Sequence, residues 1–335
     1  MSEDILRDAA GHVSAFEYDM AEKQYDEYLK EHGDDDRVWM MLGTLRLRME
    51  DLPGSSDAFG NAFDIHPENV EYAIKYGDSL MLVHKYDEAE AVFSYAAKSD
   101  SGYYVRMREA EACVSLQKTD DGLARLLALS TAFPEEPEIW HCLYRIYLSL
   151  GRSDEAQQAR EQERKFLRER AESSRGAAEW LAYGRIEWEF REYARAEQAC
   201  AASVAVEDNA PAHLYRGLSL LQLGNADAGH AELDAGLAIE PRDLSFVLQT
   251  AELLEEIGRY EDSIVWYTKA LALRNIRADT WAACAYALLQ AGKKDEARAF
   301  FEMAKASSAV REFKWADKLH KSFRTAALDA AFGGK

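Results

Sequence analysis

The chain has 335 residues, of which 48% are hydrophobic and 30% are charged, and this composition fits a folded protein and excludes a disordered one. The formal net charge is −20 at pH 7, which argues against a nucleic-acid-binding protein because phosphates require a basic surface. The same charge keeps a protein soluble and favours basic partners.

The chain begins with Met1-Ser2-Glu3-Asp4, which is acidic and lacks the apolar segment of a signal peptide. Elsewhere no uninterrupted apolar run is long enough to cross a bilayer. We therefore expect a cytoplasmic protein without a membrane span. None of the four cysteines pairs with another at metal-ligand spacing, so we expect buried thiols in a reducing compartment and no metal site.

A pair of helical segments recurs along the chain, and residues 140–160 show it clearly. A helical face with spacing i, i+3, i+4, i+7 is formed by Trp140, Leu143, Tyr144 and Tyr147. Gly151 then ends this helix, since glycine adopts the left-handed conformation without strain. Acidic residues near Ser153 begin the second helix, where they favour its positive end. The segment therefore predicts a helix, a short turn and a second helix.

The same pattern returns at regular steps, which identifies an internal repeat. Small residues stand at positions 21, 55, 89, 122, 156, 196, 229, 263 and 297. A tryptophan column is formed by Trp39, Trp140, Trp180 and Trp281, and a glycine column four residues later by Gly43, Gly77, Gly184 and Gly217. Aromatic residues stand four positions after the small residue at Tyr25, Phe59, Phe93, Tyr267 and Phe301. These columns predict nine hairpins at a spacing of 33 or 34 residues, with one step of 40.

Each column has a physical cause. The small residues let the two helices of a hairpin approach closely, and we expect the aromatic residues to fill the gap between one hairpin and the next. A single hairpin cannot bury its apolar face, so the hairpins must stack to form a continuous core.

The tryptophan, glycine, alanine, aromatic and proline columns, together with the period of about 34 residues, resemble the tetratricopeptide repeat. The resemblance covers residues 3–309 and is strongest in 39–43, 85–90, 180–184 and 281–301. It implies an all-α fold, a right-handed superhelical solenoid of antiparallel helix hairpins. It also implies that the first helices line a concave face and that the partner is a protein.

The step of 40 residues divides the array. We expect hairpins one to five in residues 1–170, hairpins six to nine in residues 171–309, and a C-terminal capping helix with a tail in residues 310–335. The surplus lies in residues 164–176, which predict a second helix that runs past its normal end, followed by a longer turn. This stretch is either a surface insertion or a hinge.

The segment after residue 309 predicts a helix that covers the last hairpin. Its apolar side is formed by Phe313, Trp315, Leu319 and Phe323, and its basic side by Arg311, Lys314, Lys318, Lys321 and Arg324. The helix is either a plain cap, a second contact site, or a site of self-association with the acidic body. The last residues, 332–335, predict a frayed end.

The sequence shows no phosphate-binding, nucleophile or zinc-protease motif, and its histidines are scattered. We therefore expect no catalytic residues, no cofactor and no enzymatic activity. The concave face is the better candidate for a functional site. Residues one position after the tryptophan column and one turn further are expected to line it, with Trp188 a turn beyond: Met40, Ile74, Asp78, Met107, Glu111, His141, Arg145, Leu181, Arg185, Trp188, Leu214 and Leu218.

Arg145 and Arg185 come from adjacent hairpins and suggest a site for a carboxylate or phosphate in the middle of the groove. We hypothesise that an extended or helical segment with an acidic group binds there; alternatively, both arginines pair with local acids such as Glu111 or Glu189. The leading function is that of a scaffold or adaptor that holds a peptide or helix of a partner protein. The alternative is an assembly chaperone that sequesters an unassembled subunit.

Overall fold

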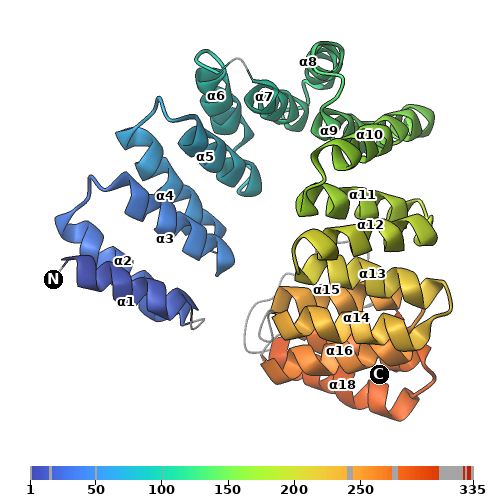
Figure 1. The fold of residues 1–335 in the computed structure, drawn as a ribbon. Coiled ribbons are helices and arrows are strands. Elements are labelled where there is room, and N and C mark those ends of the chain that lie inside the picture. The colour runs from blue at the N-terminus through green and yellow to red at the C-terminus, as the bar shows by residue number, and fades with distance from the viewer. Residues whose placement is uncertain are drawn as a thin grey trace. The chain divides into compact units, whose positions relative to one another are not determined.

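The computed structural model describes residues 2–14, 17–49, 51–100, 102–239, 244–273, 278–308, 327–328 and 330–332. Over these residues the secondary structure is α-helical, without a strand. Between residues 2 and 308, eighteen helices follow one another as nine hairpins (Figure 1), which form an all-α solenoid. No helix in the described ranges is long and apolar enough to cross a membrane.

The chain divides into two compact units, Met1–Phe166 and Leu167–Lys335. The first unit contains α1 (Ser2–Ser14), α2 (Tyr18–Glu31), α3 (Asp36–Arg48), α4 (Leu52–Ile65), α5 (Val70–Leu82), α6 (Tyr86–Ala96), α7 (Tyr103–Ser115), α8 (Thr119–Ala132) and α9 (Pro137–Ser149). The boundary falls inside α10 (Ser153–Ser174). The second unit contains α11 (Ala177–Glu189), α12 (Tyr193–Val206), α13 (Ala210–Gln222), α14 (Ala226–Ile239), α15 (Leu244–Glu256), α16 (Tyr260–Leu273), α17 (Ala278–Gln290) and α18 (Lys294–Ser308).

Local sequence fixes where the helices begin and end. The Asp35 carboxylate accepts a hydrogen bond from the backbone N–H of Val38 at the start of α3, and Asn69 accepts one from Glu71 at the start of α5. The turn inside a hairpin needs a left-handed residue, and Gly151 (φ 70°) supplies it between α9 and α10. The same backbone conformation is adopted without glycine by Gln117 (φ 64°), between α7 and α8.

The two helices of a hairpin meet where the glycine column faces the aromatic column. A Cβ atom on Gly77 would lie 2.4 Å from Cζ of Phe93, and one on Gly43 would lie 2.6 Å from Cδ1 of Phe59. Each ring therefore lies on the glycine of its own hairpin. The missing side chain leaves a hollow on the first helix that the ring of the second helix occupies. Phe93 also belongs to the same core cluster as Val105 of the next hairpin, and its ring centre lies 5.8 Å from the guanidinium carbon of Arg108, so this ring lies between hairpins as predicted.

Two tryptophans of the column, Trp39 and Trp140, anchor the loop that precedes their helix. The indole Nε1 of Trp39 donates to the carbonyl oxygen of Gly33 at 2.9 Å, and that of Trp140 donates to the carbonyl oxygen of Pro134 at 2.8 Å. The Trp140 ring also stacks on Phe166 of α10, with centroids 6.4 Å apart. These tryptophans therefore fix how the chain enters the hairpin.

The long step in the repeat lies in α10, which has 22 residues where the other second helices have 11 to 15. The predicted extension of this helix is confirmed. The predicted longer turn is wrong, because only Arg175 (φ 55°) and Gly176 separate α10 from α11. The whole surplus is accommodated as additional helix.

The end of the chain covers the last hairpin with apolar side chains. Leu328 is fully buried against Ala285 of α17 and Phe301 of α18, and the Phe332 ring lies 6.0 Å from that of Phe301. A frayed end is therefore wrong for Phe332. The residues proposed to form the capping helix and its basic side, 310–326, lie outside the described residues.

We expect Gly77→Ala to lower the free energy of unfolding by about 1–3 kcal/mol, because Phe93 is fully buried and has no room to yield to a Cβ. In Gly11→Ala, by contrast, the new Cβ meets nothing within 4 Å, so alanine should stabilise α1 by about 0.5–1 kcal/mol. Urea unfolding followed by circular dichroism measures both. Equal effects of the two substitutions would show that helix propensity, and not the contact with Phe93, governs the glycine column.

Candidate functional site

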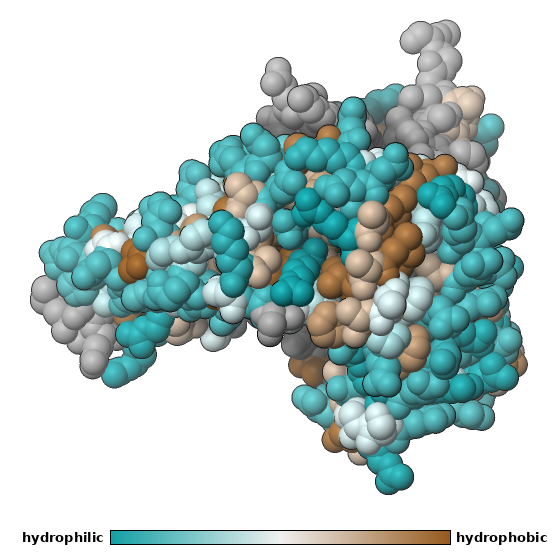
Figure 2. Space-filling view, turned by 90° about the horizontal axis from the view of Figure 1, so that it is seen from above, coloured by the Kyte–Doolittle hydropathy of each residue, from teal (hydrophilic) through white to brown (hydrophobic). Residues whose placement is uncertain are grey.

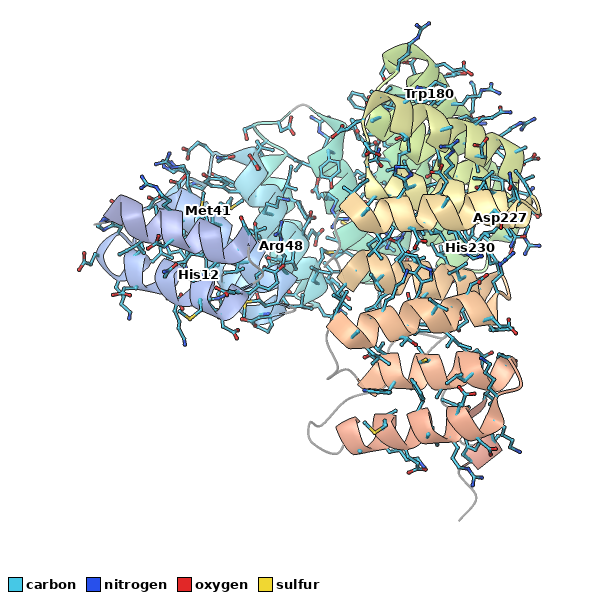
Figure 3. The ribbon with its side chains drawn as sticks, turned by 60° about the horizontal axis from the view of Figure 1, so that its bottom comes forward. His12, Met41, Arg48, Trp180, Asp227 and His230 are labelled. Carbon is cyan, nitrogen blue, oxygen red and sulfur yellow. The ribbon has the colours of Figure 1, made fainter. Side chains whose placement is uncertain are left out.

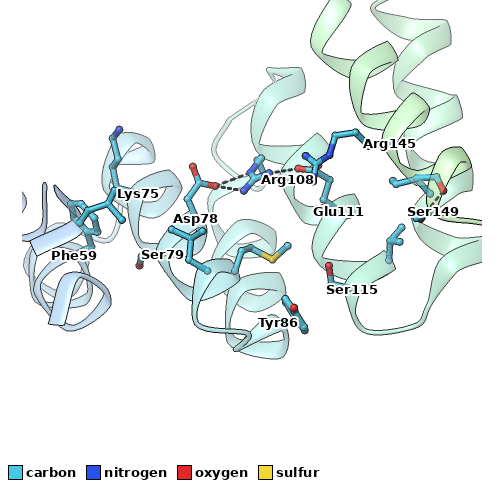
Figure 4. A pocket seen from close by; sticks show the side chains of 15 residues that line it. Phe59, Lys75, Asp78, Ser79, Tyr86, Arg108, Glu111, Ser115, Arg145 and Ser149 are labelled. Carbon is cyan, nitrogen blue, oxygen red and sulfur yellow. Dashed lines mark hydrogen bonds and ion pairs between the residues drawn. The ribbon is translucent and has the colours of Figure 1, made fainter. Parts of the chain in front are cut away.

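The first unit contains a pocket of about 690 Å³ between its first helices (Figure 4). Most of its lining comes from α5, α7 and α9, with one residue each from α3, α4 and α6. The lining residues are Leu47, Phe59, Lys75, Asp78, Ser79, Met81, Leu82, Tyr86, Arg108, Glu111, Val114, Ser115, Arg145, Ile146 and Ser149. The pocket thus extends from the second hairpin to the first helix of the fifth.

A row of alternating charges crosses the pocket from α5 through α7 to α9 (Figure 4). Nε of Arg108 donates to Oδ1 of Asp78 at 2.7 Å, Nη2 forms an ion pair with the same oxygen at 2.7 Å, and Nη1 donates to Oε2 of Glu111. On the other side of Glu111, Nη1 of Arg145 lies 3.5 Å from Oε1. Arg108 is therefore enclosed by two acids, and Arg145 ends the row.

Burial and the neighbouring charges together set the pKa values of this row. Burial raises the pKa of the Asp78 carboxyl, and Arg108 lowers it without fully compensating. Burial on its own would lower the pKa of the Arg108 guanidinium, but Glu111 and Asp78 outweigh it and the pKa is raised. Burial, followed by the neighbouring Glu111, also raises the pKa of the Cys142 thiol. The arginine is therefore held charged, and the thiol beside it is unreactive.

An apolar surface that is partly exposed to solvent lies beside the charged row. Leu47 and Leu82 are 39% and 48% exposed, which is high for leucine at a pocket. Met81, Val114 and Ile146 complete the apolar part of the lining. The pocket therefore offers both apolar area and charge, which is the combination that a segment of another protein requires.

The structure places the predicted groove residues of the first unit in two groups. Asp78, Glu111 and Arg145 line the pocket. Met40 and Ile74 are half-buried and lie outside its lining, and His141 contacts Glu163 of α10 at 3.1 Å. Met107 is buried in the core of α7–α9, so its expected place in the groove is wrong.

Helical geometry explains part of this division. Most residues in the pocket stand two, five, eight or nine positions after the tryptophan column, as Lys75, Asp78, Met81 and Leu82 do after Ala73. At about 100° per residue, the positions two, five and nine residues on share one face, whereas the positions one and eight residues on lie roughly 70–90° away from it. The eighth position lines the pocket near the C-terminal end of the helix, and the first position does not.

Sequence reasoning missed Lys75 and Arg108, which stand two positions after the column. At about 100° per residue, this position lies about 200° around the helix from the tryptophan, nearly on the opposite side. That geometry would have identified both residues.

In the second unit, Leu214 and Leu218 are fully buried in the core, so their expected exposure in a groove is wrong. Leu181 and Trp188 are half-buried, and the Trp188 ring lies 5.8 Å from Tyr215. Arg185 is exposed, with its guanidinium carbon 5.5 Å from the centre of the Tyr215 ring. Arg145 belongs to the first unit and Arg185 to the second.

Few other surface features stand out on the described residues. Figure 2 shows a mostly hydrophilic face with limited hydrophobic patches, and Met41 of α3, labelled in Figure 3, is an exposed apolar residue outside the pocket lining. Throughout the part of the chain that the structure describes, no three histidine, cysteine or acidic side chains gather as metal ligands. All four cysteines are buried, as expected.

We expect Arg108→Met to lower the free energy of unfolding of the first unit by about 2 kcal/mol near neutral pH, because two half-buried carboxylates lose their shared partner. The loss should shrink as the pH falls. Burial raises the pKa of Asp78, so the folded variant binds a proton more tightly than the unfolded chain and gains stability on acidification. Chemical unfolding at several pH values measures this. Arg145→Gln, at an exposed site, should change the free energy of unfolding by less than about 1 kcal/mol. If the loss of unfolding free energy in Arg108→Met stays constant with pH, this explanation is contradicted.

Comparison with known proteins supports the repeat. The sequence model of the tetratricopeptide repeat matches residues 40–104 and 214–280. No protein of curated function matches the chain. Among solved structures, the thermophilic repeat protein TTC0263 of Thermus thermophilus is 21% identical, with 56% of this chain and 99% of that chain covered and a TM-score of 0.41.

Two further solved structures are similar. MamA from Desulfovibrio magneticus RS-1 is 14% identical, with 50% of this chain and 93% of that chain covered and a TM-score of 0.41. PilW, a type IV pilus biogenesis factor, is 16% identical, with 61% of this chain and 92% of that chain covered and a TM-score of 0.41.

With TM-scores below 0.5, these likenesses add nothing to the assignment, which rests on the matched segments and the recurring hairpins. The first helices begin at residues 36, 70, 103 and 137 in one run and at 177, 210, 244 and 278 in another, as the repeat requires. The chain therefore contains tetratricopeptide repeats, which the sequence model matches over residues 40–104 and 214–280.

Proposed function

We propose that the protein is a scaffold or adaptor that binds a segment of a partner protein in the pocket of its first unit. The observation that carries this proposal is the pocket itself, which combines exposed leucines with a fixed row of charges over consecutive hairpins. Repeat solenoids use extended surfaces of this kind for binding. The groove residues expected in the second unit that remain accessible, Leu181, Arg185 and Trp188, are proposed as further contacts.

The exposed leucines supply the driving force. Leu47 and Leu82 lie on α3 and α5, and each leaves a large part of its apolar surface in water. Covering that surface would contribute about 1 kcal/mol for each leucine, at roughly 25 cal/mol per Å² of buried apolar area. The remaining exposed polar lining, which includes Ser115 and Ser149, would orient the backbone of the bound segment.

An assembly chaperone is the alternative function, and the same pocket serves either. A scaffold forms a stable stoichiometric complex, whereas a chaperone holds its client only until the client assembles. Pulse-chase capture separates these two functions by the lifetime of the complex. The cytoplasmic location stays a prediction of the sequence.

We expect the double variant Leu47→Glu/Leu82→Glu to lose the partner captured by the wild-type chain from a lysate of its native source. The reason is that two charges replace the apolar area at the pocket, at sites exposed enough to tolerate them. Mass spectrometry identifies the captured protein, and titration of the purified partner should show a loss of affinity of at least tenfold, which corresponds to about 1.4 kcal/mol.

The matched control is Met20→Glu/Leu127→Glu. Met20 and Leu127 are 48% and 46% exposed, lie in the same unit on second helices, and stand outside the pocket lining. The control changes the net charge by the same amount and should retain the partner. Equal retention by both double variants would move the binding site away from this pocket.

A further inference from the structure

We infer that the pocket of the first unit selects a partner segment that carries a single side-chain carboxylate among apolar residues, and that Arg145 binds this carboxylate. The inference rests on the proposed function, because it names the chemistry of the segment that the same pocket would hold. It follows from how four charged residues of the lining, Asp78, Arg108, Glu111 and Arg145, pair with one another.

Arg108 is fully engaged and serves as a positioning residue. Its Nε and Nη2 atoms both reach Asp78, its Nη1 atom reaches Glu111, and its side chain is only 19% exposed. An arginine has five N–H donors in a fixed plane, so these contacts use both edges of the guanidinium. Arg108 therefore engages both acids and offsets one of their two negative charges, which weakens their repulsion of an acidic ligand.

Arg145 is the cation of this row that remains available. Its side chain is 62% exposed, and its only ion-pair partner in the described part of the chain is Glu111, at 3.5 Å. This distance exceeds the usual N–H···O length of about 2.9 Å, so Glu111 holds Arg145 by charge without occupying its donors. The free edge of the guanidinium suits a carboxylate, which accepts two parallel hydrogen bonds.

The charge balance fits one negative charge on the ligand. The lining holds three cations, Lys75, Arg108 and Arg145, and two acids, Asp78 and Glu111, which leaves one positive charge in excess. The whole chain, by contrast, carries −20. A single carboxylate cancels the local excess, and Leu47 and Leu82 then receive the apolar residues beside it.

Selection from a random dodecapeptide library, displayed on phage and applied to the immobilised full chain, tests the inference. The wild type should enrich peptides that combine Asp or Glu with large apolar residues. Arg145→Gln should still enrich apolar peptides but lose the acidic residue. Lys98→Gln, which removes one exposed cation outside the pocket lining, should select like the wild type.

An enriched peptide, synthesised with both ends blocked, then gives the size of the effect by fluorescence anisotropy. Replacing its acidic residue by the amide should weaken binding to the wild type about tenfold, and binding to Arg145→Gln hardly at all. Arg108→Met should lower the preference for acidic over basic peptides, because Asp78 and Glu111 are then unpaired. A purely structural role of Arg108 would weaken both kinds of peptide alike.

Three outcomes would overturn the inference. Enrichment of basic peptides, or of apolar peptides without an acid, rejects the carboxylate and leaves the proposed function standing. Acidic peptides that bind Arg145→Gln as well as they bind the wild type place the anion elsewhere. A library that enriches nothing rejects peptide binding itself, and sedimentation as a dimer that Leu82→Glu disrupts would then assign the pocket to a second copy of the chain.

Discussion

The close contact between a small residue of one helix and an aromatic ring of the next is the constraint on which the rest of the structure depends. In the third hairpin the ring of Phe93 lies where a side chain on Gly77 would be. This contact fixes the distance between the two helices and also the rotation of the first helix about its axis. Once that rotation is fixed, the residues that face away from the partner helix are fixed as well. The lining of the pocket is therefore a consequence of the hairpin contact.

The same constraint explains why a row of charges is stable in a half-buried place. Asp78, Glu111 and Arg145 stand at equivalent positions of three successive first helices, so the repeat brings them into line. Arg108 stands one turn before Glu111 and reaches both neighbouring acids. Each carboxylate is thereby satisfied, which half-buried charges require. A repeat with a regular step makes such a network possible because it repeats the spacing of the side chains as well as that of the helices.

The fold was predictable from the sequence because each hairpin repeats the same small set of residues. The nine hairpins and the extended α10 follow from the spacing of small residues and from the surplus of charged, helix-favouring residues after position 163. Some details were not predictable from periodicity. Phe59 contacts the glycine of its own hairpin, and the period of the repeat does not distinguish that contact from one with the next hairpin.

The candidate site was only partly predictable, because the direction of each side chain depends on how its helix is rotated about the helix axis. The position five residues after the tryptophan column lies well inside the pocket face, so Asp78, Glu111 and Arg145 were found. The position one residue after the column lies at the edge of that face, where a small rotation of the helix about its axis decides whether the side chain points into the groove or into the core. Met107 is buried in the core. Leu218 shows a second limit: it stands at the same position as Arg145, yet it is fully buried in its own unit. Side chains at equivalent positions of the repeat therefore point in the same direction, but their exposed fractions differ. The exposed fraction depends on which neighbouring side chains cover the residue.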